Sequence, residues 1–341
     1  MAFFNRSKPQ ADALFREASA PEFAKLQLIT GKGGVGRTTT AVALARACCA
    51  RGETTLLLEV RDAESELGEV NAREAREDSM LGRALASSLE MEARSIPLGP
   101  IPTEVQKGIW AGQLVSAVGH EGYLSAVIPV ERLVRAALES KPLARFLRSA
   151  PSMHELGIFY HLKQLTDDPR FDRVIVDLPA SGHTLALTQL PARMTRLLKR
   201  GPIVEGLREG MKLLTDQRYT ALWVVTLPER LPVTEALELA EALKGDGVSP
   251  AGVILNRCAP QKLGDREREE ISKLLDQETL QTDLTARALL SSLLEEIDLN
   301  ETLAVFSRCH RLPELTNAIA RRDHVLSHWL VTPSQEEIAD V

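Results

Sequence analysis

The chain has 341 residues, of which 44% are hydrophobic and 26% charged, and its formal net charge is −6. This length can hold one large α/β domain or two ordinary ones, with a substantial core. The acidic balance argues against nucleic acid as the main partner, because a phosphate backbone demands a basic protein face. No run approaches the roughly 20 apolar residues of a membrane-spanning helix, and the first residues lack the features of a secretory signal. We therefore expect a cytoplasmic protein without a transmembrane segment.

Residues 1–23 are polar with a few apolar positions, and they predict an N-terminal leader ahead of the core. The core begins with a predicted strand over 25–30. A glycine-rich loop over 31–39 follows, and then an alanine-rich helix over 39–49. A leucine-rich run over 54–60 predicts a second buried strand.

The loop over 31–39 reads Gly-Lys-Gly-Gly-Val-Gly-Arg-Thr-Thr. Glycines let successive backbone N–H groups point at one anion, and the dipole of the following helix adds positive potential there. The pattern therefore predicts a phosphate-binding loop, although Arg37 stands where such loops normally carry lysine. The expected nucleotide-binding residues of the loop are Gly33, Gly34, Val35, Gly36, Arg37, Thr38 and Thr39.

From about residue 62 to residue 169 helical patterns dominate, and no run is convincingly strand-like. The predicted helices span 79–88, 103–118, 130–147 and 153–165. Because such a segment is too long for a loop, we expect a helical insertion subdomain over 66–169. Trp110, Leu114 and Val118 recur at helical spacing in it. Such an apolar face belongs more often to a core than to a groove for a protein client.

Buried strands then return, and their predicted ranges are 171–177, 222–226 and 252–256, with a helix over 232–243 between the last two. Strands that alternate with helices predict a doubly wound, mostly parallel α/β sheet that binds ligands beyond the carboxyl ends of its strands. We expect a nucleotide-binding domain composed of 24–65 and 170–330. An acidic tail over 331–341 completes the chain.

Asp177 ends one of these strands and is followed by Leu-Pro-Ala-Ser-Gly-His-Thr up to residue 184. An aspartate at the carboxyl end of a strand, beside a phosphate loop, is placed to hold Mg²⁺ directly or through its water. Thr38 would supply the hydroxyl ligand. Gly182 lets the backbone swing, as a segment that senses a γ-phosphate must.

These motifs resemble the ArsA-like family, which comprises arsenite-pump and tail-anchored-protein-targeting ATPases. The specific parts are the loop Gly-Lys-Gly-Gly-Val-Gly-x-Thr and the Gly-His-Thr segment at 182–184, and residues 150–156 and 227–235 also look similar. The resemblance covers roughly residues 25–320. It implies a P-loop ATPase that uses ATP and Mg²⁺, and a dimer in which Lys32 crosses to the partner's nucleotide.

The resemblance also implies roles for residues outside the loop. Asn256 is similar to the asparagine that reads adenine. Leu312 and Pro313 would close the other side of the base. The second switch, the segment after Asp177 that senses the γ-phosphate, would include Pro179, Gly182 and His183.

The implied catalytic residues are Lys32, Arg37 and Asp62. Arg37 departs from the family pattern, and so does the sequence around the first-switch aspartate. Arginine keeps the charge of lysine, but its different shape makes the exchange non-conservative in a tight phosphate cradle. The first switch normally offers an aspartate just beyond the second strand, where it orients the attacking water. Either Arg61 or Asp62 falls there, depending on one gap. We favour Asp62, with Glu59 as the fallback, although Glu59 lies inside the strand and fits a structural role better.

The four cysteines form no Cys-x-x-Cys pair, and none lies between Cys49 and Cys258. We therefore expect neither zinc nor an iron–sulfur cluster, and arsenite binding has no support. The same spacing argues against the nitrogenase-type iron proteins, which share the loop. The long insertion and the Gly-His-Thr segment argue against the partition and cell-division-site ATPases.

Two hypotheses remain. The first is an ATPase that forms a homodimer, or a heterodimer with a related ATPase, and couples its nucleotide state to a protein client or partner, with the client held at the helical insertion. The alternative is a nucleotide-binding regulatory subunit that hydrolyses little and pairs with a competent homologue. Arg37, and the ambiguity over whether Arg61 or Asp62 occupies the position of the water-orienting aspartate, favour the alternative.

Overall fold

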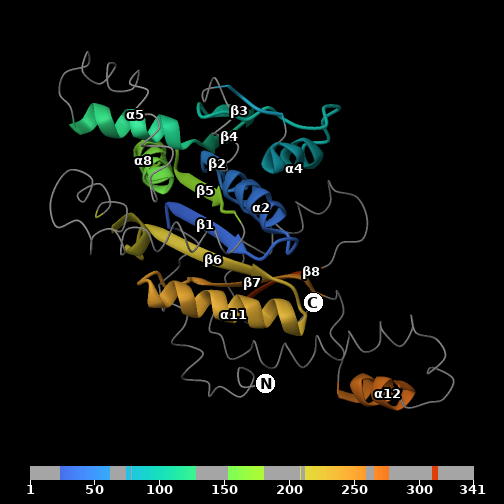
Figure 1. Ribbon diagram of the computed structural model, residues 1–341. Helices are drawn as coiled ribbons and strands as arrows, with labels where there is room; N and C mark the ends of the chain where they lie inside the picture. Colours follow the sequence, from blue (N-terminus) through green and yellow to red (C-terminus); the bar gives the residue numbers. More distant parts are fainter. Residues whose placement is uncertain are drawn as a thin grey trace.

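The computed structural model describes residues 24–61, 74–77, 79–127, 153–179, 208, 212–258, 265–275 and 309–313. Its centre is one eight-stranded sheet with the order β3-β4-β2-β5-β1-β6-β7-β8, as Figure 1 shows. The strands are β1 (Leu26–Gly31), β2 (Thr55–Val60), β3 (Thr103–Gln106), β4 (Ile109–Leu114), β5 (Arg173–Asp177), β6 (Thr220–Thr226), β7 (Gly252–Cys258) and β8 (Cys309–Pro313). Every neighbouring pair is parallel except β3 and β4, which are antiparallel.

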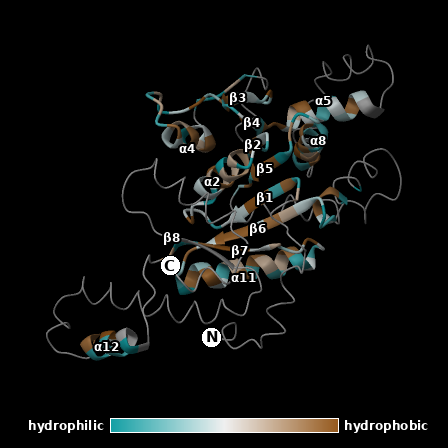
Figure 2. Ribbon diagram, turned by 180° about the vertical axis from the view of Figure 1, so that it is seen from behind, coloured by the Kyte–Doolittle hydropathy of each residue, from teal (hydrophilic) through white to brown (hydrophobic). Residues whose placement is uncertain are grey.

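Helices cover both faces of this sheet, as expected of a doubly wound fold. The described helices are α2 (Arg37–Ala50), α4 (Met80–Ser88), α5 (Ser116–Val127), α8 (Met153–Asp167), α11 (Arg230–Gly245) and α12 (Asp265–Leu275). One apolar cluster joins α2 and α4 to one face of the sheet, and a second joins α8 and α11 to the opposite face. Figure 2 shows how hydrophobic the covered strands are. The prediction of a mostly parallel α/β fold is confirmed.

The strands of the predicted core are confirmed, with small shifts of their ends. All six residues of β1 are buried, and so are all five of β5. In β2 the side chains alternate between the clusters, because Leu56 and Leu58 pack in one and Leu57 in the other. A strand buried on both faces has a continuous apolar sequence, which is why these runs were recognisable.

The predicted helix over 103–118 is wrong. Residues 103–114 form the hairpin of β3 and β4, with Gly108 at a φ of 81° in its turn, and β4 pairs with β2 in the main sheet. Trp110 and Leu114 are four residues apart, and this spacing keeps two side chains on one face of a strand as well as of a helix. Both pack in the apolar cluster on the α8 side, whereas Val118 belongs to the separate helix α5.

The helical insertion is therefore wrong as a description of the whole range 66–169, since two of its strands extend the main sheet. The helices expected over 79–88 and 153–165 are confirmed as α4 and α8. Residues 130–147, the leader over 1–23 and the tail over 331–341 lie outside the described residues. Within the described residues, no helix is both long and apolar enough to span a membrane.

Helices α5 and α8 pack together more closely than side chains allow. A Cβ on Gly119 would lie 1.7 Å from the carbonyl oxygen of Gly157, so both positions must lack a side chain. Beside this contact, the buried His161 accepts a hydrogen bond at Nδ1 from the backbone N–H of Val115, at 3.0 Å. Burial lowers the pKa of His161 to about 4 against its backbone hydrogen bonds to Pro100 and Val115.

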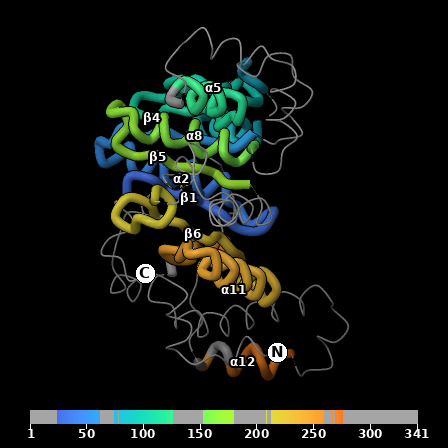
Figure 3. The backbone as a smooth tube through the Cα atoms, turned by 60° about the vertical axis from the view of Figure 1, so that its left-hand side comes forward, coloured from blue at the N-terminus to red at the C-terminus, as the bar shows by residue number. Residues whose placement is uncertain are grey.

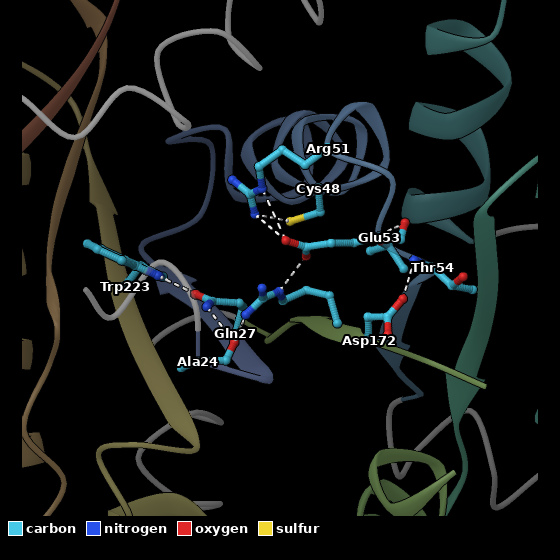
Figure 4. A network of polar contacts seen from close by, with 10 residues as sticks. Ala24, Gln27, Cys48, Arg51, Glu53, Thr54, Asp172 and Trp223 are labelled. Carbon is cyan, nitrogen blue, oxygen red and sulfur yellow. Dashed lines mark hydrogen bonds and ion pairs between the residues drawn. The ribbon is translucent and has the colours of Figure 1, made fainter. Parts of the chain in front are cut away.

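A network of polar side chains connects the strands at their amino ends (Figure 4). Arg173 of β5 donates to Glu53, just before β2, at 2.9 Å, and to the carbonyl oxygen of Ala24. Gln27 of β1 donates to the same carbonyl at 2.8 Å and accepts from the indole N–H of Trp223 in β6 at 2.7 Å. The network thus connects β1, β2, β5 and β6.

Candidate nucleotide-binding site

The glycine loop connects the carboxyl end of β1 to the start of α2. Gly31 has a φ of 152°, and a Cβ there would lie 2.3 Å from the carbonyl oxygen of Val225 in β6. Gly36, at a φ of 91°, is the N-cap of α2, and no side chain caps this end in the described part of the chain. The first turn of α2 carries no acidic residue. The N–H groups at this helix end are thus available to an anion.

Thr38 and Asp177 meet beside this loop. The Thr38 hydroxyl donates to Oδ2 of Asp177 at 2.6 Å. The other oxygen, Oδ1, is buried and has no hydrogen-bond partner among the described residues. Burial raises the pKa of Asp177 to about 6, although the Thr38 hydrogen bond and the charge of Arg37 act in the opposite direction. A buried carboxylate oxygen without a partner, next to a hydroxyl, is a donor set that fits Mg²⁺.

Arg37 is turned toward the segment that follows Asp177. Its Nη1 donates to the carbonyl oxygen of Leu178. The same Leu178 donates its backbone N–H to Ile29 of β1 at 2.9 Å. The guanidinium therefore joins the start of α2 to the first residue beyond β5, and this contact engages its Nη1.

Lys32, the second cation of the loop, contacts α11. Its Nζ lies 2.9 Å from Oε1 of Glu235. Both side chains remain partly accessible, at 53% for Lys32 and 27% for Glu235. Glu235 lies far from the lysine in the sequence and no local pattern connects the two, so the sequence did not predict Glu235 as a site residue.

Asn256, near the end of β7, lies against the loop. Its Nδ2 donates to the carbonyl oxygen of Val35 at 2.8 Å, and its Oδ1 accepts from the backbone N–H of Arg257 at 3.0 Å. A Cβ on Gly36 would lie 2.2 Å from the same Nδ2, so this glycine makes room for the asparagine. The structure thus brings Asn256 to the loop, and its contact with adenine stays a prediction.

Leu312 and Pro313 lie at the end of β8. In the register of the sheet, Pro313 is opposite Cys258 of β7. The backbone therefore places both residues on the strand next to that of Asn256. Their contact with a nucleotide base stays a prediction.

Two of the first-switch candidates, Glu59 and Arg61, lie within the described residues, and their contacts show how each is engaged. The Glu59 carboxylate accepts from the Ser79 hydroxyl at 2.6 Å, from the backbone N–H groups of Met80 and Leu81 at 3.1 and 3.3 Å, and from Gln113 at 3.1 Å. Glu59 therefore stabilises the first turn of α4. Four donors already engage this carboxylate, which leaves Glu59 poorly suited to orient water.

Arg61 is buried in the same network. Its Nε and Nη2 donate to Oε1 of Gln113 at 3.0 and 2.7 Å, and Nη2 also donates to the carbonyl oxygen of Glu74. Gln113 of β4 thus bridges Glu59 and Arg61 and connects β4 to β2. This contact could not be predicted from the sequence, because residues 103–118 were predicted to form a helix. Asp62 lies outside the described residues, and so do Gly182 and His183; Pro179 is described and follows Leu178.

The structure therefore places most of the predicted site residues at the carboxyl ends of the parallel strands. The loop from Gly33 to Thr39 lies beyond β1, Asp177 ends β5, and Asn256 lies near the end of β7. The described residues contain no group of three or more His, Cys, Asp or Glu side chains that could hold a metal ion. The glycine loop and the Thr38–Asp177 pair thus lie together at the carboxyl ends of the strands.

The similarity to known proteins agrees with this geometry. A family model of anion-transporting ATPases matches residues 24–206. The ATPase BagA of Mycobacterium tuberculosis is 29% identical over 261 residues, which cover 74% of this chain and 70% of BagA. The ATPase GET3B of Arabidopsis thaliana is 25% identical over 316 residues, 81% of this chain and 75% of that protein.

A third relative is longer. The arsenical pump-driving ATPase of Escherichia coli is 25% identical over 232 residues, which cover 68% of this chain but only 34% of the pump protein. The family match spans more than half of the 341 residues, and it includes the glycine loop, Thr38 and Asp177. The chain belongs to the anion-transporting ATPase family, also called ArsA ATPases, and is an ATPase.

Proposed function

We propose that the chain binds ATP with Mg²⁺ at the loop over 31–39, hydrolyses it within a dimer, and couples its nucleotide state to a protein client or partner. The observation that carries the binding site is the Thr38–Asp177 contact of 2.6 Å, with the second oxygen of Asp177 buried and unpartnered. A carboxylate is costly to bury in this way, so its retention is best explained by a cation that completes it.

Each loop residue has a role in this proposal. The backbone N–H groups from Gly33 to Thr39 cradle the phosphates, and Arg37 exchanges Leu178 for a phosphate oxygen. Thr38 and Asp177 would hold Mg²⁺, which neutralises phosphate charge when bound. Lys32 would bind the nucleotide of the partner subunit. Asp62 is the proposed residue for orienting water, because Glu59 and Arg61 are engaged elsewhere.

The alternative, a regulatory subunit with little hydrolysis, is favoured by one observation. Arg37 is anchored on the carbonyl oxygen of Leu178, and a guanidinium held there adds a cost to phosphate binding that a free side chain would not have. Under this alternative the chain binds nucleotide but needs a related, competent subunit for turnover.

Steady-state ATP hydrolysis by the purified chain, with and without Mg²⁺, tests the proposal. We expect Mg²⁺-dependent turnover that falls at least about 100-fold in Thr38→Ala, since metal and phosphate positioning supplies most of the catalysis. Thr103→Ala, which changes an exposed threonine of β3, is the matched control and should keep the parent rate.

Arg37→Lys separates the two candidates. Arg218→Lys is its control, because Arg218 lies on the surface and pairs with Asp216. Turnover in the parent supports the ATPase. ATP binding without turnover, with recovery in Arg37→Lys, would support the regulatory subunit instead. A parent that binds no ATP would contradict both.

A further inference from the structure

The position of Lys32 follows from the way β1 and β6 end. Gly31 is paired in register with Val225 of β6, and its missing side chain lets the two backbones approach closely. Lys32 follows Gly31 directly, and its side chain reaches Glu235 of α11, the helix that follows β6. Helix α11 begins at Arg230, only four residues after β6 ends at Thr226. Figures 1 and 3 show β6 next to β1, and α11 on the side of β6 away from β1.

Glu235 presents its carboxylate from a well-anchored helix. Val233, Ala236 and Leu237 around it are buried in the apolar cluster on this face of the sheet. Lys32 instead belongs to a loop and has a half-exposed side chain. Of the two partners at 2.9 Å, the carboxylate is thus the fixed one and the ammonium is the one free to move.

A phosphate and a carboxylate compete for the same ammonium. The ammonium of Lys32 lies 2.9 Å from Glu235 of its own subunit, whereas the proposed function takes it to the nucleotide of the partner subunit, so Lys32 has to leave Glu235 to reach that phosphate. We propose that Glu235 is a positioning residue that holds Lys32 on its own subunit until nucleotide phosphate takes the lysine over. This inference rests on the proposed function, in which Lys32 binds nucleotide.

The expected size of the effect is small and measurable. Exposed ion pairs contribute modestly, and the loss of such a restraint should tighten binding of the competing phosphate by about two- to five-fold. Screening by salt should reduce the effect, because both partners contact solvent.

Methyl-lysine NMR tests the contact itself. The full-length chain is reductively methylated with ¹³C, and the Lys32 resonance is assigned by its loss in Lys32→Ala. We expect Glu235→Gln to shift this resonance in the absence of nucleotide. Glu238→Gln removes the same charge from an exposed position on the same helix, and it should leave the resonance unchanged. An unchanged resonance in Glu235→Gln would overturn the proposal.

Titration with a non-hydrolysable ATP analogue and Mg²⁺ tests the exchange. The analogue should move the parent's Lys32 resonance, and Glu235→Gln should bind it about two- to five-fold more tightly than the parent or Glu238→Gln. In a Lys32→Ala background the Glu235 substitution should have no effect, because its partner is gone. Equal or weaker binding by Glu235→Gln would overturn the proposal.

The two readouts separate this inference from the proposed function. A parent that binds no analogue contradicts the proposed function, and the exchange fails with it, while the nucleotide-free resonance still reports whether Glu235 holds Lys32. A parent that binds the analogue with an unmoved Lys32 resonance contradicts the inference alone.

Discussion

The two ends of the strands in this sheet differ in how their polar groups are satisfied. At the amino ends, Glu53 accepts from Arg51 and Arg173, and Gln27 uses both ends of its amide on Ala24 and Trp223 (Figure 4). At the carboxyl ends, two of the four buried side-chain atoms without partners in the described part of the chain belong to Asp177 and Thr226, the last residues of β5 and β6.

The difference extends to the charges. Burial alone would raise the pKa of Glu53, but the hydrogen bonds and charges of Arg173 and Arg51 lower it. Burial raises the pKa of Asp177 to about 6, and Thr38 and Arg37 do not compensate. The polar groups at the amino ends (the amino edge) therefore stabilise the fold. At the carboxyl ends (the carboxyl edge), Asp177 and Thr226 retain buried oxygen atoms that a ligand can bind.

The largest expected effect is at the amino edge. Glu53→Ala leaves the buried Arg173 without its carboxylate, and we expect a loss of about 3 kcal/mol in the free energy of unfolding. Urea denaturation measures it. Asp168→Ala, which removes a surface partner of Arg170, should cost much less, because an exposed ion pair contributes little to stability. Equal losses in the two variants would refute a stabilising role for the amino edge.

His161 qualifies the comparison, because it satisfies the N–H of Val115 just beyond the end of β4. Its pKa of about 4 lies below the unfolded value of 6.5, so its contribution to stability is complete above about pH 6.5. Between that pH and pH 4 we expect a loss of about 3 kcal/mol, since the unfolded chain takes up the proton first. Unfolding curves of the parent and His161→Gln should therefore converge as the pH falls. A constant gap would contradict this.

The carboxyl edge should respond in the opposite sense. Asp177→Asn removes a buried charge, and we expect the metal-free chain to gain about 2 kcal/mol at pH 8. The folded pKa of Asp177 is raised, so this aspartate favours folding at pH 4 and loses that contribution as the pH rises through about 6. The gain should accordingly shrink at pH 4. Thermal melts in EDTA measure both values, and destabilisation at pH 8 would show that the carboxylate supports the fold.

The smallest stability effect is expected from the loop cation. Arg37→Ala loses one hydrogen bond to the Leu178 carbonyl oxygen, which is worth about 1 kcal/mol in the nucleotide-free chain. Its effect on ATP affinity should be larger, because a phosphate contact is charge-assisted. Thermal melts of the parent and Arg37→Ala, with and without ATP, separate the effect on stability from the effect on ATP affinity. A larger loss without ATP than with it would place Arg37 in the fold rather than in the site.

The parts of the site that sequence could predict are those with local signals. The glycine loop and Asp177 follow buried apolar strands, so both their identity and their place at the sheet edge were predictable. The capping of α4 by Glu59 and the contact of Lys32 with Glu235 depend on strands pairing across the fold, and no local pattern encodes them. β4 was missed because a four-residue apolar spacing fits both periods, and with it Gln113 was missed as the bridge between Glu59 and Arg61.

The most direct test of the site is calorimetric titration of ATP into the parent and Asp177→Asn, each with Mg²⁺ and with EDTA. The proposed function predicts that Mg²⁺ strengthens ATP binding to the parent by at least about ten-fold, because Asp177 and Thr38 would contribute to its coordination, and that Asp177→Asn abolishes this gain. Equal affinity with Mg²⁺ and with EDTA in the parent, or a gain that persists in Asp177→Asn, would contradict the assignment of this edge as the Mg²⁺–ATP site.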